Sequence, residues 1–88
     1  MVDRYTDGFI NVEAIQFKRT EWKNIRRFAG KNIYKMVVPG CQNESATCLL
    51  KTKREILTVT EGEWIAKGDG FFVCEAKVFS KTYKKIDG

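Results

Sequence analysis

The stretch FINVEAIQF, residues 9–17, decides the fold that the sequence predicts. β-Branched and aromatic residues dominate it, as is typical of strands. Their partial alternation separates two faces, with Ile10, Val12 and Ala14 on one and Ile15 and Phe17 on the other. Because both faces carry apolar side chains, we expect a strand that is at least partly covered on both sides.

Next along the chain, residues 20–29 carry start and stop signals of a helix. Thr20 offers a hydroxyl as N-cap, Glu21 is favourable in the first turn, and Gly30 supplies a left-handed stop. The apolar residues of this segment recur at helical spacing and predict a buried stripe: Trp22, Ile25, Phe28 and Ala29. We therefore expect one helix at Thr20–Ala29.

Short β-prone runs follow the helix. We expect strands at Ile33–Val38, Ala46–Lys51, Glu55–Val59, Trp64–Lys67 and Phe71–Glu75. Pro39-Gly40 ends the first, and the glycines of Gly68-Asp69-Gly70 are expected to adopt positive φ in a tight turn. Short strands joined by such turns indicate an antiparallel meander. Ala76–Phe79 could form one helical turn, and Lys84–Gly88 is expected to be frayed.

These elements predict an α+β fold, with one helix packed on a small, mostly antiparallel meander of five or six strands, or on a partly open barrel. A length of 88 residues fits a single domain, residues 1–88, with an ordered core at about residues 9–83. A domain of this size has modest stability by itself, so homo-oligomers are compatible with the sequence.

The residues that most often perform catalysis or bind metals are scarce in this sequence. It contains no histidine, which excludes the commonest general base and the Ser-His and Cys-His nucleophiles. Its three cysteines lack Cys-x-x-Cys spacing, and we expect buried thiols at Cys48 and Cys74 and an exposed one at Cys41. Glu61 and Glu63 remain as catalytic candidates, but we expect a solvated hairpin tip there. The sequence thus predicts neither an enzyme nor a cofactor nor a metal site.

Basic residues exceed acidic ones by 16 to 11, a formal net charge of +5 that favours anionic partners. The first basic group falls on the predicted helix, on the face opposite Trp22: Lys23, Arg26, Arg27 and Lys31. No acidic residue interleaves them, and like charges at this spacing repel. Two interpretations stay open, a merely solvated face and a face that binds an anionic nucleotide or nucleic acid.

Two further basic groups lie later in the chain. Lys51, Lys53 and Arg54 occupy the predicted hairpin turn. The others follow in the tail, where charge can serve solubility: Lys77, Lys81, Lys84 and Lys85. Nearly all aromatic side chains are expected in the core, and Tyr34 and Tyr5 are the rings we would expect to be exposed if any ring binds a partner.

Several motifs together resemble a known group of proteins. They are the V-E-A-I-Q-F strand at residues 12–17, the Phe28-Ala29-Gly30 helix end, E-G-E-W-I-A-K-G at residues 61–68, and a closing segment with Phe79 and Tyr83. This order resembles small phage and prophage proteins, mostly uncharacterised, over residues 11–83. In the group, Gly-Asp stands where this chain has Gly62-Glu63. The group includes an anti-CRISPR family, so the resemblance implies counter-defence.

The leading hypothesis is therefore a phage accessory protein that inhibits a host defence system, such as CRISPR–Cas, by stoichiometric binding to a host protein or to an anionic nucleotide or nucleic acid. The alternatives are a small basic nucleic-acid-binding module and a minor virion or assembly protein. Apolar runs are too short for a membrane span and no secretory signal is visible. We therefore expect the protein in the cytoplasm of a bacterial host, without a membrane partner.

The matching positions are read as structural. Trp64 and Ile65 follow a glycine turn and should alternate between the two faces of a strand. Phe79 and Tyr83 are spaced to hold the tail against the core.

Overall fold

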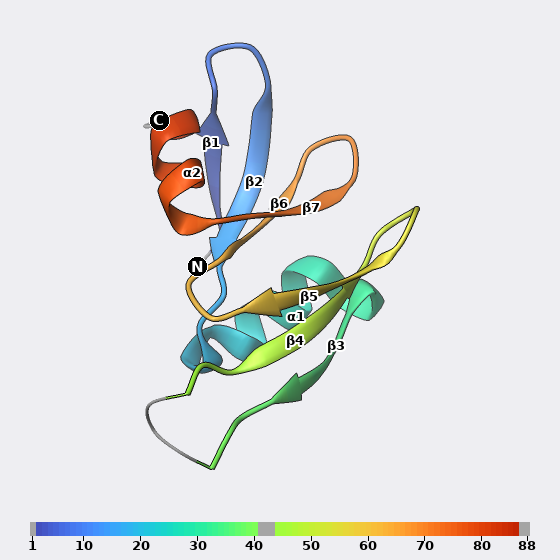
Figure 1. Ribbon diagram of the computed structural model, residues 1–88. Helices are drawn as coiled ribbons and strands as arrows, with labels where there is room; N and C mark the ends of the chain where they lie inside the picture. Colours follow the sequence, from blue (N-terminus) through green and yellow to red (C-terminus); the bar gives the residue numbers. More distant parts are fainter. Residues whose placement is uncertain (1, 41–43, 87–88) are drawn as a thin grey trace.

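The computed structural model describes residues 2–40 and 44–86 (Figure 1). Its elements, in chain order, are β1 (Asp3–Thr6), β2 (Asn11–Gln16), the 3-10 helix η1 (Arg19–Glu21), α1 (Trp22–Ala29), the 3-10 helix η2 (Gly30–Asn32), β3 (Ile33–Val37), β4 (Thr47–Lys51), β5 (Ile56–Thr60), β6 (Trp64–Lys67), β7 (Phe71–Cys74), α2 (Ala76–Thr82) and β8 (Lys84–Lys85). The α+β fold predicted from the sequence is confirmed.

The strands form two antiparallel sheets rather than one meander. A five-stranded sheet has the order β7-β6-β2-β1-β8, and a three-stranded sheet has the order β3-β4-β5. The chain passes from the second sheet to the first at the turn between Thr60 and Trp64. There β6 pairs with β2 instead of continuing beside β5, so that β2 has a partner on each edge.

Strand β2 is covered on both faces, as its sequence predicts. Val12 and Ala14 point to one core cluster, while Ile15 and the following Phe17 point to another. All four side chains are at most 4% exposed. The five-stranded sheet is therefore the middle layer of the molecule, with a core on each side.

The first cluster lies between this sheet, α1 and the three-stranded sheet. Its buried members are Ile15, Phe17, Ile25, Ala29, Ile33, Ala46, Cys48, Leu50, Val59 and Ile65. Trp22 and Phe28 pack at its margin, which confirms the predicted apolar stripe of the helix. Phe28 also meets Phe71 of β7 edge-to-face, with 5.6 Å between ring centroids.

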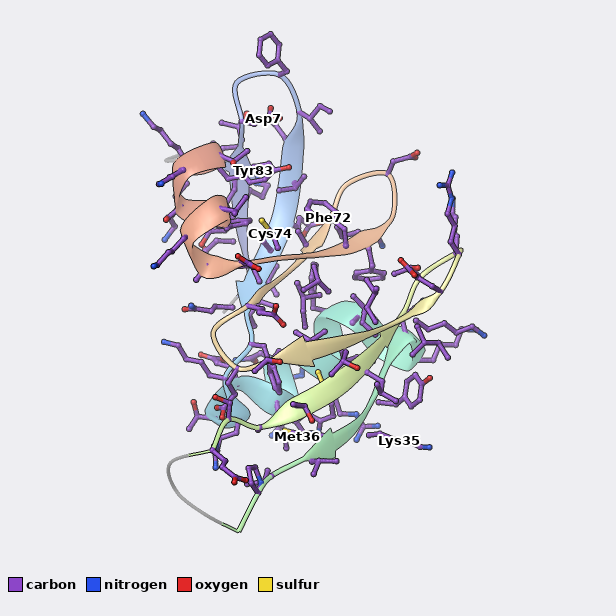
Figure 2. All side chains as sticks on the ribbon, in the orientation of Figure 1. Asp7, Lys35, Met36, Phe72, Cys74 and Tyr83 are labelled. Atoms are coloured by element: carbon purple, nitrogen blue, oxygen red, sulfur yellow. The ribbon has the colours of Figure 1, made fainter. Side chains whose placement is uncertain are left out.

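The second cluster lies between the five-stranded sheet and α2. Phe79 of α2 is 2% exposed and stacks on Trp64 at 4.3 Å and on Tyr83 at 4.9 Å. Phe72, Cys74 and Tyr83, labelled in Figure 2, also pack against this cluster, and the rings of Phe72 and Tyr83 are 6.4 Å apart between centroids. Trp64 faces this cluster and Ile65 faces the first one, which confirms that the two residues alternate between the faces of β6. Phe79 and Tyr83 pack the C-terminal segment against the core, as predicted.

The N-terminal boundary of the first predicted strand is wrong. Phe9 and Ile10 belong to the β1–β2 turn and are 96% and 59% exposed. The Asp7 side chain defines this turn, because its Oδ1 accepts hydrogen bonds from the backbone N–H groups of Phe9 (2.8 Å) and Ile10 (2.7 Å). Gly8 adopts φ +99°, a conformation that favours glycine.

The helix also starts later than predicted. Residues Arg19–Glu21 form the η1 turn, α1 begins at Trp22, and the N-cap position is Glu21, without a side-chain capping bond. Thr20 is therefore not the N-cap. The end of the helix before Gly30 is confirmed, but this glycine combines φ +58° with ψ −132°, so the stop is not in the left-handed helical conformation that was expected.

The Gly68-Asp69-Gly70 turn forms, but the reason given for its glycines is wrong. Positive φ among the described glycines occurs at Gly8, Gly30 and Gly62. At Gly68 an added Cβ would lie 3.3 Å from Cγ1 of Val12, so a close approach to β2 favours glycine there.

The tail is more ordered than the sequence predicts. The helical turn expected at Ala76–Phe79 extends to Thr82 as α2, and Lys84–Lys85 forms β8 instead of fraying. Strand β8 pairs with β1. Strand β1 was not predicted, and it precedes residues 9–83, the range in which the ordered core was expected. In β3, a register irregularity lies between Tyr34 and Val37, and Lys35 there has φ +52°.

Replacing Phe79 by alanine should lower the free energy of unfolding by about 3–5 kcal/mol, because a buried ring stacked on two others is removed. Urea titration followed by circular dichroism measures the change. Val78→Ala is the matched control, since Val78 lies beside Phe79 in α2 but is 50% exposed, and it should shift stability by at most about 0.5 kcal/mol. Equal losses in both variants would contradict a core role for Phe79.

Candidate functional site

The predicted basic helix face lies on the outer side of α1. Lys23, Arg26 and Arg27 are exposed, while Ile25 on the opposite side is fully buried. Within the described residues, none of these three cations is in an ion pair with a carboxylate. Their charges are thus available to a partner.

Lys31 follows α1 in η2 and meets the second basic group. It lines a depression of about 340 Å³ together with Lys51 and Lys53 of the β4–β5 hairpin. Asn32 joins the two segments, because its Nδ2 donates a hydrogen bond to the carbonyl oxygen of Lys51 at 2.9 Å. The fold therefore brings two predicted basic groups together. We call the combined set the basic surface: Lys23, Arg26, Arg27, Lys31, Lys51 and Lys53.

The remaining predicted cations lie elsewhere. Arg54 lines another depression, of about 380 Å³, between the β4–β5 and β6–β7 turns, and Lys53, Glu55 and Asp69 line it as well. Two of the tail lysines lie on α2, on the other side of the five-stranded sheet from α1 (Figure 1), and two lie on β8, an edge strand of that sheet. There Lys85 Nζ is 3.5 Å from Oδ2 of Asp3.

Trp22 borders the basic surface, a position that the sequence interpretation did not predict. It was assigned to the core alone, yet it also lines an open depression of about 410 Å³ whose other lining residues are Lys23, Arg26 and Arg27. Its ring contacts Phe17 with 6.4 Å between centroids, which holds it from the core side. The available signal was its position at the edge of the apolar stripe, one turn before Arg26.

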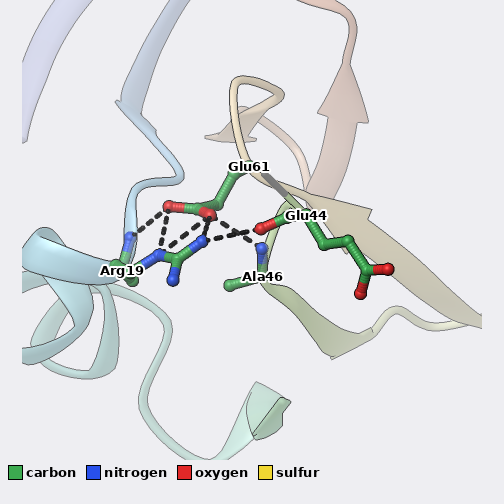
Figure 3. A network of polar contacts seen from close by, with 4 residues as sticks. All are labelled: Arg19, Glu44, Ala46 and Glu61. Carbon is green, nitrogen blue, oxygen red and sulfur yellow. Dashed lines mark hydrogen bonds and ion pairs between the residues drawn. The ribbon is translucent and has the colours of Figure 1, made fainter. Parts of the chain in front are cut away.

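Glu61 is the centre of a polar network rather than part of a solvated hairpin tip (Figure 3). Its carboxylate pairs with the Arg19 guanidinium, at 2.6 Å from Nη2, and accepts the backbone N–H groups of Arg19 (2.9 Å) and Ala46 (2.7 Å). Arg19 Nη2 also donates to the carbonyl oxygen of Glu44 at 3.0 Å. The network ties the β5–β6 turn to the segment before α1 and to the start of β4.

The same contacts account for the acidity of Glu61. Hydrogen bonds from the Arg19 side chain, and then from the Ala46 and Arg19 backbone, lower its pKa from 4.5 to about 2. Glu63 is also engaged, since its Oε1 accepts the backbone N–H of Thr60 at 2.6 Å. Both carboxylates considered for catalysis therefore have structural partners, and the expected solvated tip is wrong.

The cysteines and tyrosines are placed as follows. Cys48 is 1% exposed, and burial, followed by the charge of Glu63, raises its pKa to about 12. Cys74 is partly buried in β7 with a pKa raised mainly by burial, and Cys41 lies outside the described residues. Tyr5 and Tyr34 are both partly buried, and Tyr5 packs edge-to-face on Trp64 and Phe79.

Within residues 2–40 and 44–86, no three Cys, Asp or Glu side chains gather as ligands for a metal ion. No helix in this described part has the length and apolar character needed to cross a membrane.

Comparison with known proteins adds no relative: no family model, no curated protein and no solved structure matches the chain.

Replacing Glu61 by glutamine should lower the free energy of unfolding at pH 7 by about 1–2 kcal/mol, because charge-assisted hydrogen bonds are weakened at a partly exposed site. Folding lowers the pKa of Glu61 from 4.5 to about 2, so the ionised group stabilises the fold fully above about pH 4.5. This contribution is lost as the pH falls toward 2. The difference between variant and wild type should disappear over the same range.

Urea titrations at several pH values between 2 and 7 measure this convergence. Glu75→Gln is the control, because Glu75 is exposed and no hydrogen bond to its side chain is found in the described residues. A constant difference between Glu61→Gln and wild type at all pH values would contradict the assignment.

Proposed function

We propose that this protein is a phage accessory protein that inhibits a bacterial defence system by stoichiometric binding, and that the basic surface is the part that binds. The observation that carries the proposal is the basic surface itself, six exposed cations from two segments of the chain on neighbouring elements. The phage resemblance of the opening strand and the E-G-E-W-I-A-K-G segment supports the biological setting.

The arrangement of charges favours an anionic partner. Like charges one helical turn apart repel, so Lys23 with Arg26 and Arg27, three and four residues further along α1, is slightly destabilising in the isolated protein. A bound anionic surface removes that repulsion and releases counterions. Folding alone therefore gives no reason for this clustering, whereas binding does.

The state of the carboxylates favours binding over catalysis. Glu61 has a pKa of about 2 and accepts three groups of donors, so it is a poor proton acceptor near neutral pH. Glu63 caps the Thr60 amide. Cys48 is buried with a raised pKa, which keeps its thiol protonated and weakly nucleophilic. These groups hold the fold together.

The test compares two variants that each lose three positive charges. Arg27→Gln, Lys31→Gln and Lys51→Gln together remove half of the basic surface. Lys77→Gln, Lys81→Gln and Lys84→Gln together are the matched control on the α2 side. All six residues are exposed, so both variants should fold with unchanged melting temperatures.

In bacteria that carry an active CRISPR–Cas system, expression of the wild-type protein should restore plaque formation by a targeted phage. The control variant should restore it to the same extent, whereas the basic-surface variant should lose most of the effect. Efficiency of plating is the measurement. Equal activity of the two variants, or no restoration by the wild-type protein across a panel of such defence systems, would contradict the proposal.

A further inference from the structure

We infer that the basic surface takes single-stranded nucleic acid, with a base stacked on Trp22 and the backbone phosphates on the surrounding cations. This inference rests on the proposed function and names the chemistry of its partner. The observation behind it is the depression whose lining consists of Trp22, Lys23, Arg26 and Arg27.

The depression combines the two features that single-strand binding requires. Aromatic rings provide stacking platforms for bases, and cations beside them hold phosphates. At about 410 Å³ its volume falls in the range of ligand pockets, about 300–1,000 Å³. Neither Lys23 nor Arg26 nor Arg27 is in an ion pair with a carboxylate of the described residues, so the phosphates would meet no internal competitor.

Trp22 is held in place before any ligand arrives. It sits at the first position of α1 and packs against the first core cluster, where it contacts Phe17. Trp22 also borders the depression, and the residue is only partly buried. A ring fixed by the core loses little conformational freedom on binding, which favours its use as a stacking platform.

The cations continue beyond this depression. Helix α1 is eight residues and about 12 Å long, and after it Lys31 of η2 lines a second depression with Lys51 and Lys53 of the hairpin. A strand that starts with a base on Trp22 would therefore meet further phosphate contacts along the helix and at the hairpin. The basic surface has room for several nucleotides.

Two other anionic partners fit less well. In a duplex the faces of the bases are stacked on one another, so none is available to Trp22 without unpairing. The acidic side chains of a protein segment would pair with Arg26 and Arg27 but would leave the indole unused unless the segment also carried a ring, whereas every nucleotide of a single strand carries both a phosphate and a base. The juxtaposition of ring and cations therefore favours an unpaired base with its phosphate.

Fluorescence polarisation of labelled oligonucleotides tests the inference with the intact protein. The probes are a single strand, the same strand with abasic sites throughout, and the corresponding duplex, each at several salt concentrations. The single strand should bind with a log–log salt slope between about −2 and −4, since each neutralised phosphate contributes about −0.7 and six cations are present. The abasic strand should bind about 5- to 150-fold more weakly, because stacking is lost while the phosphates remain.

Variants locate the effect. Trp22→Ala should weaken binding of the normal strand to the level of the abasic strand and leave abasic binding unchanged, whereas Trp22→Phe should restore most of the affinity. Phe9→Ala is the aromatic control, because Phe9 is 96% exposed at the β1–β2 turn, and it should bind as the wild type does. Melting temperatures verify that Trp22→Ala is folded, and the abasic probe needs no variant at all. A mononucleotide competitor distinguishes a free nucleotide from a strand as the source of the base.

Equal affinities for normal and abasic strands, tighter binding of the duplex, or no binding at low salt would each overturn the inference. Displacement of the strand by micromolar mononucleotide would also overturn it and indicate a nucleotide site instead. If no oligonucleotide binds but the basic surface is still needed for plaque restoration, the proposed function stands and this inference is wrong. If strands bind as described but plaques are not restored, this inference stands and the proposed function is wrong.

Discussion

The burial of β2 on both faces is the constraint on which the rest of the structure depends. Val12 and Ala14 require cover on one side of the strand, and Ile15 and Phe17 on the other. One layer of helix and strand cannot supply both. The chain therefore builds α2 over one face and α1 with the three-stranded sheet over the other, and the five-stranded sheet becomes a middle layer.

A second interaction fixes how the parts meet. The chain passes between the two sheets at the β5–β6 turn, and Glu61 of this turn binds Arg19 just before α1 and the amide of Ala46 just before β4. One carboxylate thus aligns three segments at one junction. Helix α1 is fixed at its N-terminal end by this junction and along its inner side by the buried Ile25 and Ala29, so its cations face outward. Lys31, which follows the helix, then lies beside the β4–β5 hairpin.

The sequence predicted the features that depend on neighbouring residues along the chain. The β-prone runs, the apolar stripe of α1 and the stop at Gly30 were correct within one or two residues at most boundaries. Strands β1 and β8 were missed because they are short and rich in charge, and they exist through pairing with each other and with β2. Glu61 was misread because Arg19 lies 42 residues away along the chain, and sequence spacing carries no sign of that contact.

The candidate site shows the same division between local and long-range information. The helix cations could be found from spacing alone, but their union with Lys51 and Lys53 depends on how η2 packs beside the hairpin. Trp22 is harder to assign from the sequence, because a residue at the edge of an apolar stripe can pack against the core and still border the solvent. In this protein Glu61 and Glu63, the two carboxylates at the junction, are engaged in folding, whereas the cations of α1 have no partner among the described residues. The cations of α1 are therefore not used by the fold, and a charge that the fold does not use is available for recognition.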